Sequence, residues 1–278
     1  MPSIIEQIKN RRSVRSYTGE PLSEKHKQLI LNYIASLQAP FGVKARINLI
    51  HTNTDSGKVK LGTYGFVGGA TDFLTLVYEE SPLADEGSAY LFEQVVLFCT
   101  ELGLGTCWLG GSFSRKNFAN QLVLQPNEKL RIVSPVGYPS DKKRLWETIM
   151  GAEKNHASRK PFGTYFFDDD FSQPLSEEKA RDFCMPLEMV RIAPSANNSQ
   201  PWRIVLQKDT LHFYYCPAMG GFSAIDLGIA MCHFEQACHE LFISGKFEML
   251  NASIISLVPK DFRYVISWKR QVESCIVR

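Results

Sequence analysis

Pro21-Leu22-Ser23-Glu24 recurs as Pro174-Leu175-Ser176-Glu177, 153 residues further along the chain. After each copy the apolar residues show helical spacing, and each helical stretch ends in Ala-Pro before a strand-like apolar run. The two Ala-Pro pairs are Ala39-Pro40 and Ala193-Pro194, and the runs that follow are residues 47–50 and 203–206. This order of landmarks indicates a duplicated unit.

A second landmark supports the duplication. Asp85-x-Gly87-x-Ala89 opens one long amphipathic stretch, and Asp226-x-Gly228-x-Ala230 opens another, 141 residues later. Repeats of this size are too long for a solenoid, whose period is about 20–50 residues. The sequence therefore predicts two diverged α+β halves, residues 1–152 and 153–278, which together resemble a fused dimer.

Helices and strands alternate in both halves. A capping box at Ser3 and Glu6 predicts a short first helix. The other predicted helices cover residues 23–37 and 85–102, a stretch from 176, and residues 226–244. The predicted strands are residues 46–52, 73–79, 105–111, 130–138, 203–207 and 210–215.

Composition narrows the class of protein. The chain has 278 residues, 44% hydrophobic and 22% charged, with a formal net charge of +2. This is a globular composition, and its near-neutral charge favours neither nucleic acid nor an anionic membrane as a partner. No targeting segment or membrane span is predicted, and the 7 cysteines form no metal-ligand pattern. We expect a cytoplasmic protein with reduced thiols and no metal.

An arginine-rich segment follows the first predicted helix. It comprises Arg11, Arg12, Ser13, Val14 and Arg15. Guanidinium groups pair with two oxygens at once, which suits a phosphate. In an extended segment Arg11, Ser13 and Arg15 face one way and Arg12 faces the other. A solvated basic turn is the alternative interpretation.

Two further segments combine small, polar and aromatic residues. Residues 193–202, APSANNSQPW, form a loop whose Asn198 and Gln200 can each donate and accept hydrogen bonds. Such groups suit the polar edge of a heterocycle, whereas a polar turn after a helix is the simpler alternative. Residues 103–111, GLGTCWLGG, supply glycines that let a flat ring approach the backbone. A helix C-cap followed by a buried strand explains the same glycines without a ligand.

Together these segments resemble the FMN-dependent nitroreductase family. That family carries an RRSxR-type segment near its N-terminus, an APSxxNxQPW loop and a GLGTCWxGG-type segment after a long helix. The sequence PVGYP at residues 135–139 resembles a further family segment near the C-terminus. The resemblance implies a nitroreductase-like fold, bound FMN and NAD(P)H as the electron donor.

The resemblance also implies roles for individual residues. Arg11, Ser13 and Arg15 match contacts to the phosphate, ribityl chain and pyrimidine edge of FMN, with Arg12 as a backbone or phosphate contact. The residues matching those around the flavin ring are Pro194, Ser195, Ala196 and Asn198, with Gln200 in support. Gly110 and Gly111 match the backbone near flavin N5. Lys142, Lys143 and Arg144 are candidates to close the phosphate site, and spacing does not choose among them.

The distribution of these segments departs from the family pattern. The first half has Ala39-Pro40-Phe41-Gly42 in place of the amide loop, and the second half has no RRSVR, only Ser158-Arg159-Lys160-Pro161-Phe162. Family dimers take the two segments from different subunits. The chain therefore resembles a tandem-duplicated branch, in which a monomer acts as a pseudo-dimer with one complete flavin site.

The function implied is transfer of hydride from NAD(P)H through FMN to an electron-poor small molecule, such as a nitro compound or a quinone. Two alternatives remain at this point. One is other flavin chemistry on the same scaffold, namely dehalogenation or flavin destruction. The other is a flavin-binding protein without turnover.

Overall fold

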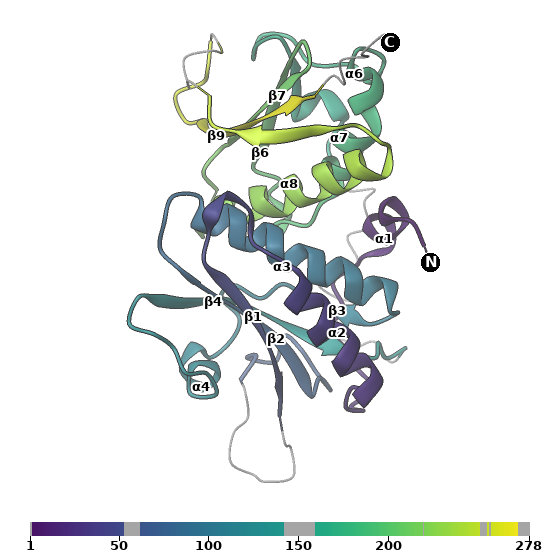
Figure 1. The fold of residues 1–278 in the computed structure, drawn as a ribbon, viewed down its shortest axis with the longest axis vertical. Helices are drawn as coiled ribbons and strands as arrows, with labels where there is room; N and C mark the ends of the chain where they lie inside the picture. Colours follow the sequence, from purple (N-terminus) through teal and green to yellow (C-terminus); the bar gives the residue numbers. More distant parts are fainter. Residues whose placement is uncertain are drawn as a thin grey trace, which may run out of the picture. The chain divides into compact units, whose positions relative to one another are not determined.

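The computed structural model describes residues 2–52, 62–141, 159–218, 220–250, 255 and 257–271. The chain divides into two compact units (Figure 1). The first unit comprises Asn10–Ala157 with Met1–Pro2, and the second comprises Ser158–Arg278 together with Ser3–Lys9. Each unit is a mixed α+β structure, which agrees with the predicted fold class.

The first unit is built on a four-stranded antiparallel sheet in the order β1-β2-β4-β3. Its strands are β1 (Ala45–His51), β2 (Asp72–Glu79), β3 (Gly105–Thr106) and β4 (Glu128–Gly137). Its helices are α2 (Glu24–Ser36), α3 (Ala84–Glu101) and α4 (Arg115–Ala119), with the 3-10 turn η1 (Pro40–Gly42) before β1.

The second unit is built on a five-stranded sheet in the order β5-β6-β7-β9-β8. Its strands are β5 (Phe166–Asp168), β6 (Trp202–Gln207), β7 (Thr210–Tyr215), β8 (Gly245–Glu248) and β9 (Arg263–Arg270). Its helical elements are α1 (Ile4–Asn10), η4 (Phe162–Thr164), α6 (Glu177–Ala180), η5 (Arg181–Phe183), α7 (Cys184–Arg191), η6 (Ala196–Asn198) and α8 (Ser223–Glu240). Among the described strands of this sheet, only β5 pairs in parallel, with β6.

The two sheets confirm the duplication. β6-β7-β9-β8 repeats the order β1-β2-β4-β3, and in each sheet the 18-residue helix α3 or α8 follows the second strand. Both central strands shift register at matching places, between Leu76 and Val77 in β2 and between Phe213 and Tyr214 in β7. A bulge is a specific irregularity, so its repetition indicates a common origin for the two units.

Helix boundaries mostly follow the sequence signals. Ser23 caps α2 as predicted, because its hydroxyl accepts a hydrogen bond from the backbone N–H of His26. The single helix predicted from Ser176 is instead broken into α6, η5 and α7. The break falls at Arg181, whose φ of 50° ends α6, and Pro186 prevents a helical hydrogen bond to the carbonyl of Asp182 because proline has no N–H and its ring clashes with that carbonyl.

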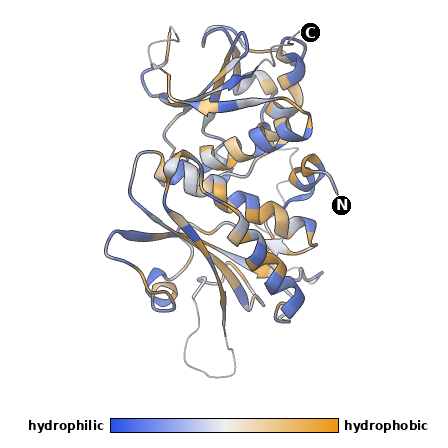
Figure 2. Cartoon of the chain, in the orientation of Figure 1, coloured by the Kyte–Doolittle hydropathy of each residue, from blue (hydrophilic) through white to orange (hydrophobic). Residues whose placement is uncertain are grey.

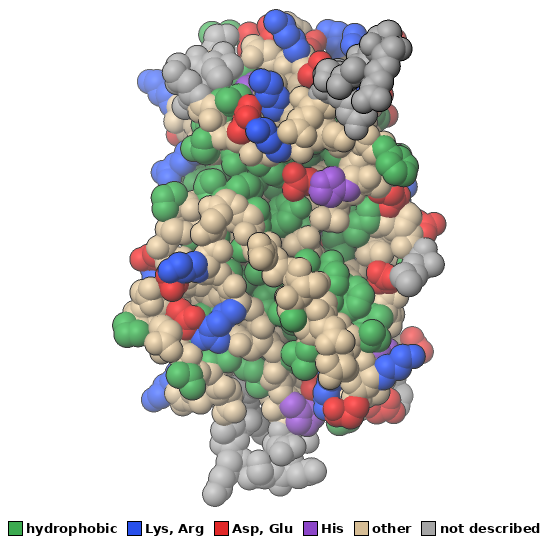
Figure 3. All heavy atoms as spheres, viewed as in Figure 1, with side chains coloured by type: hydrophobic (Ala, Val, Ile, Leu, Met, Phe, Trp, Pro, Cys, Tyr) green, Lys and Arg blue, Asp and Glu red, His purple; other side chains and the backbone are tan. Residues whose placement is uncertain are grey.

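The long helices α3 and α8 combine hydrophobic and hydrophilic residues along their length (Figure 2), and most of their side chains are buried. Helices buried to this extent are core elements rather than surface ones. On the face drawn in Figure 3, cations and anions are interspersed. Among the described residues, no helix is both long and apolar enough to cross a membrane.

Candidate functional site

The arginine segment is held in the first unit by backbone hydrogen bonds on two sides. The N–H of Val14 donates to the carbonyl of Thr106 (2.8 Å), and the N–H of Gly68 donates to the carbonyl of Arg15 (2.9 Å). Ser13 forms a parallel bridge with Thr106. Ser13 and Thr106 are 93 residues apart in sequence, so the arginine segment and the glycine segment lie side by side only in the folded chain.

Arg11 lies in a buried polar network. Its Nε is 3.9 Å from Oε1 of Glu93, and both side chains are almost completely buried. The indole N–H of Trp108 donates to the other oxygen of Glu93, Oε2 (2.7 Å). Burial lowers the pKa of Arg11, while the charge of Glu93 acts in the opposite direction. Arg12 is exposed, and Ser13 and Arg15 are half-buried. Sequence reasoning missed Glu93, whose only signal was an acid in an apolar helix.

The glycine segment is shorter as a strand than predicted, because β3 ends at Thr106. A side chain on Gly105 would meet Val14 at 2.7 Å, so this glycine permits the arginine segment to pack closely. A side chain on Gly111 would meet nothing within 4 Å. Within the described part of the chain, the backbone N–H groups of Gly110 and Gly111 have no hydrogen-bond acceptor. Gly110 is half-buried and Gly111 is exposed, so both N–H groups can donate to an acceptor on a ligand.

The amide loop of the second unit has an unusual backbone. Asn197, Asn198 and Gln200 all have positive φ, at 53°, 58° and 44°. Asn tolerates the left-handed region better than most residues, but Gln does not, so the surrounding structure must stabilise this turn. Such backbone strain is found preferentially at ligand sites.

Gln200 stabilises this loop through hydrogen bonds of its backbone and its side chain. Its N–H donates to the hydroxyl of Ser195 (3.0 Å), and its side-chain carbonyl accepts from the hydroxyl of Tyr165 (2.5 Å). Its side-chain amide donates to the carbonyl of Asn198. Gln200 is 3% exposed, so its polar groups are used inside the protein. Pro194, Ser195, Ala196 and Asn198 are partly exposed around it.

Arg159 and Asp226 hold the first part of the amide loop. Nη2 of Arg159 donates to the carbonyls of Ile192 (3.2 Å) and Ala193 (2.6 Å), just before the loop. The N–H of Ala196 donates to Oδ1 of Asp226 (2.9 Å), at the start of α8. Arg159, which in sequence is only a remnant of an arginine segment, thus supports the loop instead.

The corresponding turn of the first unit keeps the backbone shape but not the chemistry. Phe41 and Gly42 in η1 have φ of 64° and 69°, which match Asn197 and Asn198. None of the residues Pro40, Phe41 and Gly42 has a polar side chain. The turn packs against Gly87 of α3, because a side chain added to Gly87 would meet the carbonyl of Pro40 at 3.0 Å. The second copy alone therefore presents amide groups on this turn.

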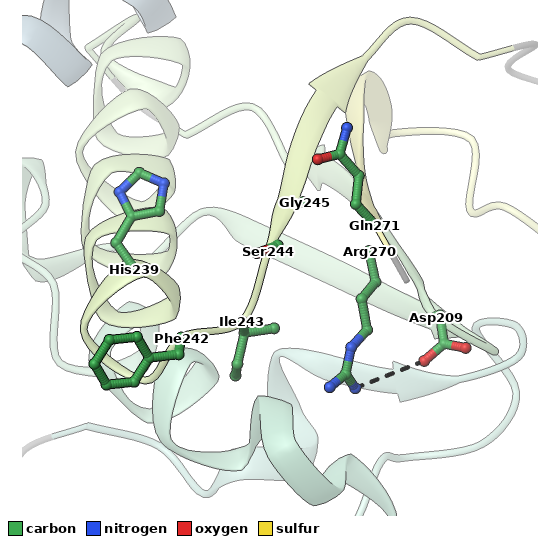
Figure 4. Close-up of a pocket in the computed structure, with 8 residues that line it drawn as sticks. All are labelled: Asp209, His239, Phe242, Ile243, Ser244, Gly245, Arg270 and Gln271. Carbon is green, nitrogen blue, oxygen red and sulfur yellow. Dashed lines mark ion pairs between the residues drawn. The ribbon is translucent and has the colours of Figure 1, made fainter. Parts of the chain in front are cut away.

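The remaining predicted residues do not add to the site. Lys142, Lys143 and Arg144 lie outside the described residues. No cluster of three metal-ligating side chains occurs among the residues that the structure describes. A hollow of about 810 Å³ lies in the second unit, beyond the C-terminal end of α8 (Figure 4). It is lined by His239, Phe242 and Arg270 among others, and contains none of the predicted site residues.

Comparison with known proteins shows where this architecture occurs. A family model described as "Putative TM nitroreductase" matches residues 3–238. The crystal structure of a nitroreductase-type protein from Thermotoga maritima superposes with a TM-score of 0.60 at 20% sequence identity. The match covers 97% of this chain and 93% of the Thermotoga chain, so the fold is shared over both units.

Shorter proteins match about half of the chain. A nitroreductase-type protein from Desulfovibrio desulfuricans, solved in complex with FMN, is 22% identical, with a TM-score of 0.41. The match covers 53% of this chain and 95% of that one. A nitroreductase with bound FMN from Bacteroides fragilis is 19% identical, with a TM-score of 0.41, and the match covers 52% and 92% of the two chains. No curated protein matches in sequence.

Proposed function

The chain belongs to the nitroreductase family whose model it matches over residues 3–238, and on that premise we propose that it is an FMN-dependent oxidoreductase. The proposed donor is NAD(P)H, and the proposed acceptor is an electron-poor small molecule such as a nitro compound or a quinone. The observation that carries the proposal is the pair of backbone N–H donors at Gly110 and Gly111, in the same glycine segment whose Thr106 pairs with Ser13 of the arginine segment.

The proposed contacts follow from the chemistry of each segment. Arg11, Ser13 and Arg15 would contact the phosphate, the ribityl chain and the pyrimidine edge of FMN, with Arg12 as a backbone or phosphate contact, because guanidinium and hydroxyl groups donate to such acceptors. Arg11 belongs to the same segment and is held by Glu93. The N–H groups of Gly110 and Gly111 would donate toward flavin N5, which favours the reduced, more electron-rich ring.

The amide loop would supply the other contacts. Pro194, Ser195 and Ala196 would present small, rigid surface to the ring, and Asn198 would hydrogen bond to its polar edge. Gln200 would act through the loop that it braces. When bound, FMN supplies the redox chemistry, and the protein binds and orients it. Lys142, Lys143 and Arg144 remain candidates for closing the phosphate site.

We further propose that the chain is a monomer with one flavin site, because each of the two required segments occurs once, the arginine segment in the first unit and the amide loop in the second. The test is the visible spectrum of the purified protein, with mass identification and quantitation of any molecule that heat releases. We expect one FMN per chain, and NAD(P)H should bleach the yellow spectrum.

The Arg15→Ala variant tests the assignment of the arginine segment. Loss of a charge-assisted hydrogen bond of about 1.5–3 kcal/mol should weaken FMN binding about 10- to 100-fold. Lys25→Ala, which removes an exposed cation from α2 in the same unit, is the matched control and should leave the affinity unchanged. A colourless protein that refuses added FMN would overturn the proposal, and two FMN per chain would overturn the single site. Dehalogenation, or chemical destruction of the flavin without reduction of an acceptor, would indicate the alternative chemistry.

A further inference from the structure

Asp226 is a buried acid that contacts the backbone of the amide loop. It is 3% exposed and lies in the first two turns of α8. Its Oδ1 accepts the N–H of Ala196 at 2.9 Å. Its other oxygen, Oδ2, is buried without a hydrogen-bond partner among the described residues. A carboxylate in this state is unfavourable for folding, so another benefit must explain its presence.

The environment of Asp226 opposes its ionisation. Burial raises the pKa of Asp226 to about 7, against the lowering effects of the Ala196 N–H and the Ser199 side chain. Within the described chain, no charged side chain contributes to this pKa. Asp226 therefore changes charge near neutral pH. Its ionised form is the stronger acceptor for the N–H of Ala196.

The duplicated residue in the first unit does something different. Asp85 accepts a hydrogen bond from the hydroxyl of Tyr78, and Nε of Arg131 lies 4.0 Å from its Oδ1. The turn at Phe41 and Gly42 is not among its hydrogen-bond partners. The same sequence motif thus holds a loop only in the unit whose loop has kept its amide groups.

We propose that Asp226 is the positioning residue of the amide loop, and that its carboxylate fixes the backbone at Ala196 in the conformation that binds the flavin. This inference rests on the proposed function for the identity of the ligand. Its structural part, the control of the loop by Asp226, does not depend on that identity. Ala196 is followed directly by the two left-handed residues Asn197 and Asn198, so a change at its N–H alters the direction of both side chains.

The test compares Asp226→Asn with Asp85→Asn, the same substitution at the duplicated position. Flavin fluorescence quenching gives the Kd for FMN at about pH 6 and about pH 8, on either side of the Asp226 pKa. The wild type should bind FMN up to about 10-fold more weakly at the lower pH, because only a tenth of Asp226 is then ionised. Asp226→Asn should lack this part of the pH dependence and should bind about 10-fold more weakly at the higher pH. Asp85→Asn should follow the wild-type profile.

The phosphate of FMN also titrates near pH 6, but this contribution is common to all variants and cancels in the comparison. A second readout uses the flavin-free protein. Amide hydrogen exchange at Ala196, expressed as a protection factor, should fall in Asp226→Asn and stay unchanged in Asp85→Asn.

Each outcome decides a separate question. Unchanged loop protection and an unchanged FMN profile in Asp226→Asn would overturn the role of Asp226. Loss of loop protection in a protein that binds no FMN in any form would keep the positioning role and reject the proposed function. A loss of FMN affinity that parallels a loss of global stability would also overturn the positioning role of Asp226. Positioning predicts that Asp226→Asn binds FMN more weakly although the variant is at least as stable as the wild type at the higher pH.

Discussion

Arg11 and Glu93 form an ion pair inside the first unit, with side-chain exposures of 6% and 0%. Removing both charges from water is unfavourable, and their attraction offsets this only while both are present. Each charge is therefore tolerated in the interior only while the other is present, and the pair adds little net stability. Its value lies in holding the first residue of the arginine segment in one place.

We expect Glu93→Gln to lower the free energy of unfolding by about 3 kcal/mol, because it leaves the charge of Arg11 buried without its partner. The amide oxygen of Gln still accepts from Trp108, so the variant isolates the charge. Urea unfolding of the flavin-free protein measures the effect. The double variant Arg11→Met/Glu93→Gln should recover most of the loss, and additive effects of the two substitutions would show that the residues are not coupled.

At the scale of elements, the duplicated sheets share a requirement for glycine at one edge. β3 begins at Gly105 and β8 begins at Gly245, and in both a neighbour occupies the space of a side chain. A Cβ on Gly105 would lie 2.7 Å from Val14, and one on Gly245 would lie 2.1 Å from the ring of Trp268. The glycine segment thus has a packing role in addition to its proposed ligand role.

Gly105→Ala and Gly245→Ala should each lower the free energy of unfolding by about 1–3 kcal/mol or more, since overpacking displaces the neighbouring residue. Gly245→Ala should have the larger effect because an indole ring is stiffer than a valine side chain. Gly111→Ala is the control, since its side chain would enter open space. Thermal melts of the three flavin-free variants make the comparison, and an unstable Gly111→Ala protein would contradict this account.

At the scale of the whole molecule, the division into units does not follow the order of the sequence, because an N-terminal segment belongs to the second unit. α1 (Ile4–Asn10) precedes the first unit in sequence, yet Ser3–Lys9 belong to the second. The N–H of Ile5 donates to Oε2 of Glu240, in the last turn of α8. The duplication boundary near residue 152 therefore describes the sequence repeat but not the full content of each unit.

Deletion of residues 1–9 should destabilise the second unit in particular, because α1 loses its contact with the end of α8. We expect amide protection in the last turns of α8 to fall at least 10-fold, while protection in β2 of the first unit stays the same. Hydrogen exchange with mass spectrometry measures both. Glu240→Gln, which keeps an acceptor for Ile5, should have a much smaller effect, and equal losses in β2 and α8 would contradict the assignment of α1.

Much of the fold could be predicted from local signals. Ser23 caps its helix, Asp85 and Asp226 lie in the first turns of the two long helices, and the repeated landmarks predict two related sheets, because caps, periodicity and repeats are local features of the sequence. The second long helix begins at Ser223, three residues before its predicted start, and ends at Glu240 rather than at residue 244. The strands β8 and β9 were missed, although residues 263–270 are rich in aromatic and β-branched residues. The helix after Ser176 was wrongly predicted as continuous because the break at Arg181 and the effect of Pro186 were overlooked.

The sequence by itself determined the duplication, the α+β class and the three segments that resemble a flavin site. Only the tertiary structure decided which partners these residues have. Three such contacts are the ion pair of Arg11 with Glu93, the hydrogen bond from Ala196 to Asp226, and the hydrogen bond from Ile5 of α1 to Glu240. Each joins residues that are 30 or more positions apart in the sequence. Hydrogen bonds and ion pairs of this kind are set by how the chain folds back on itself, and no local pattern of residues encodes them.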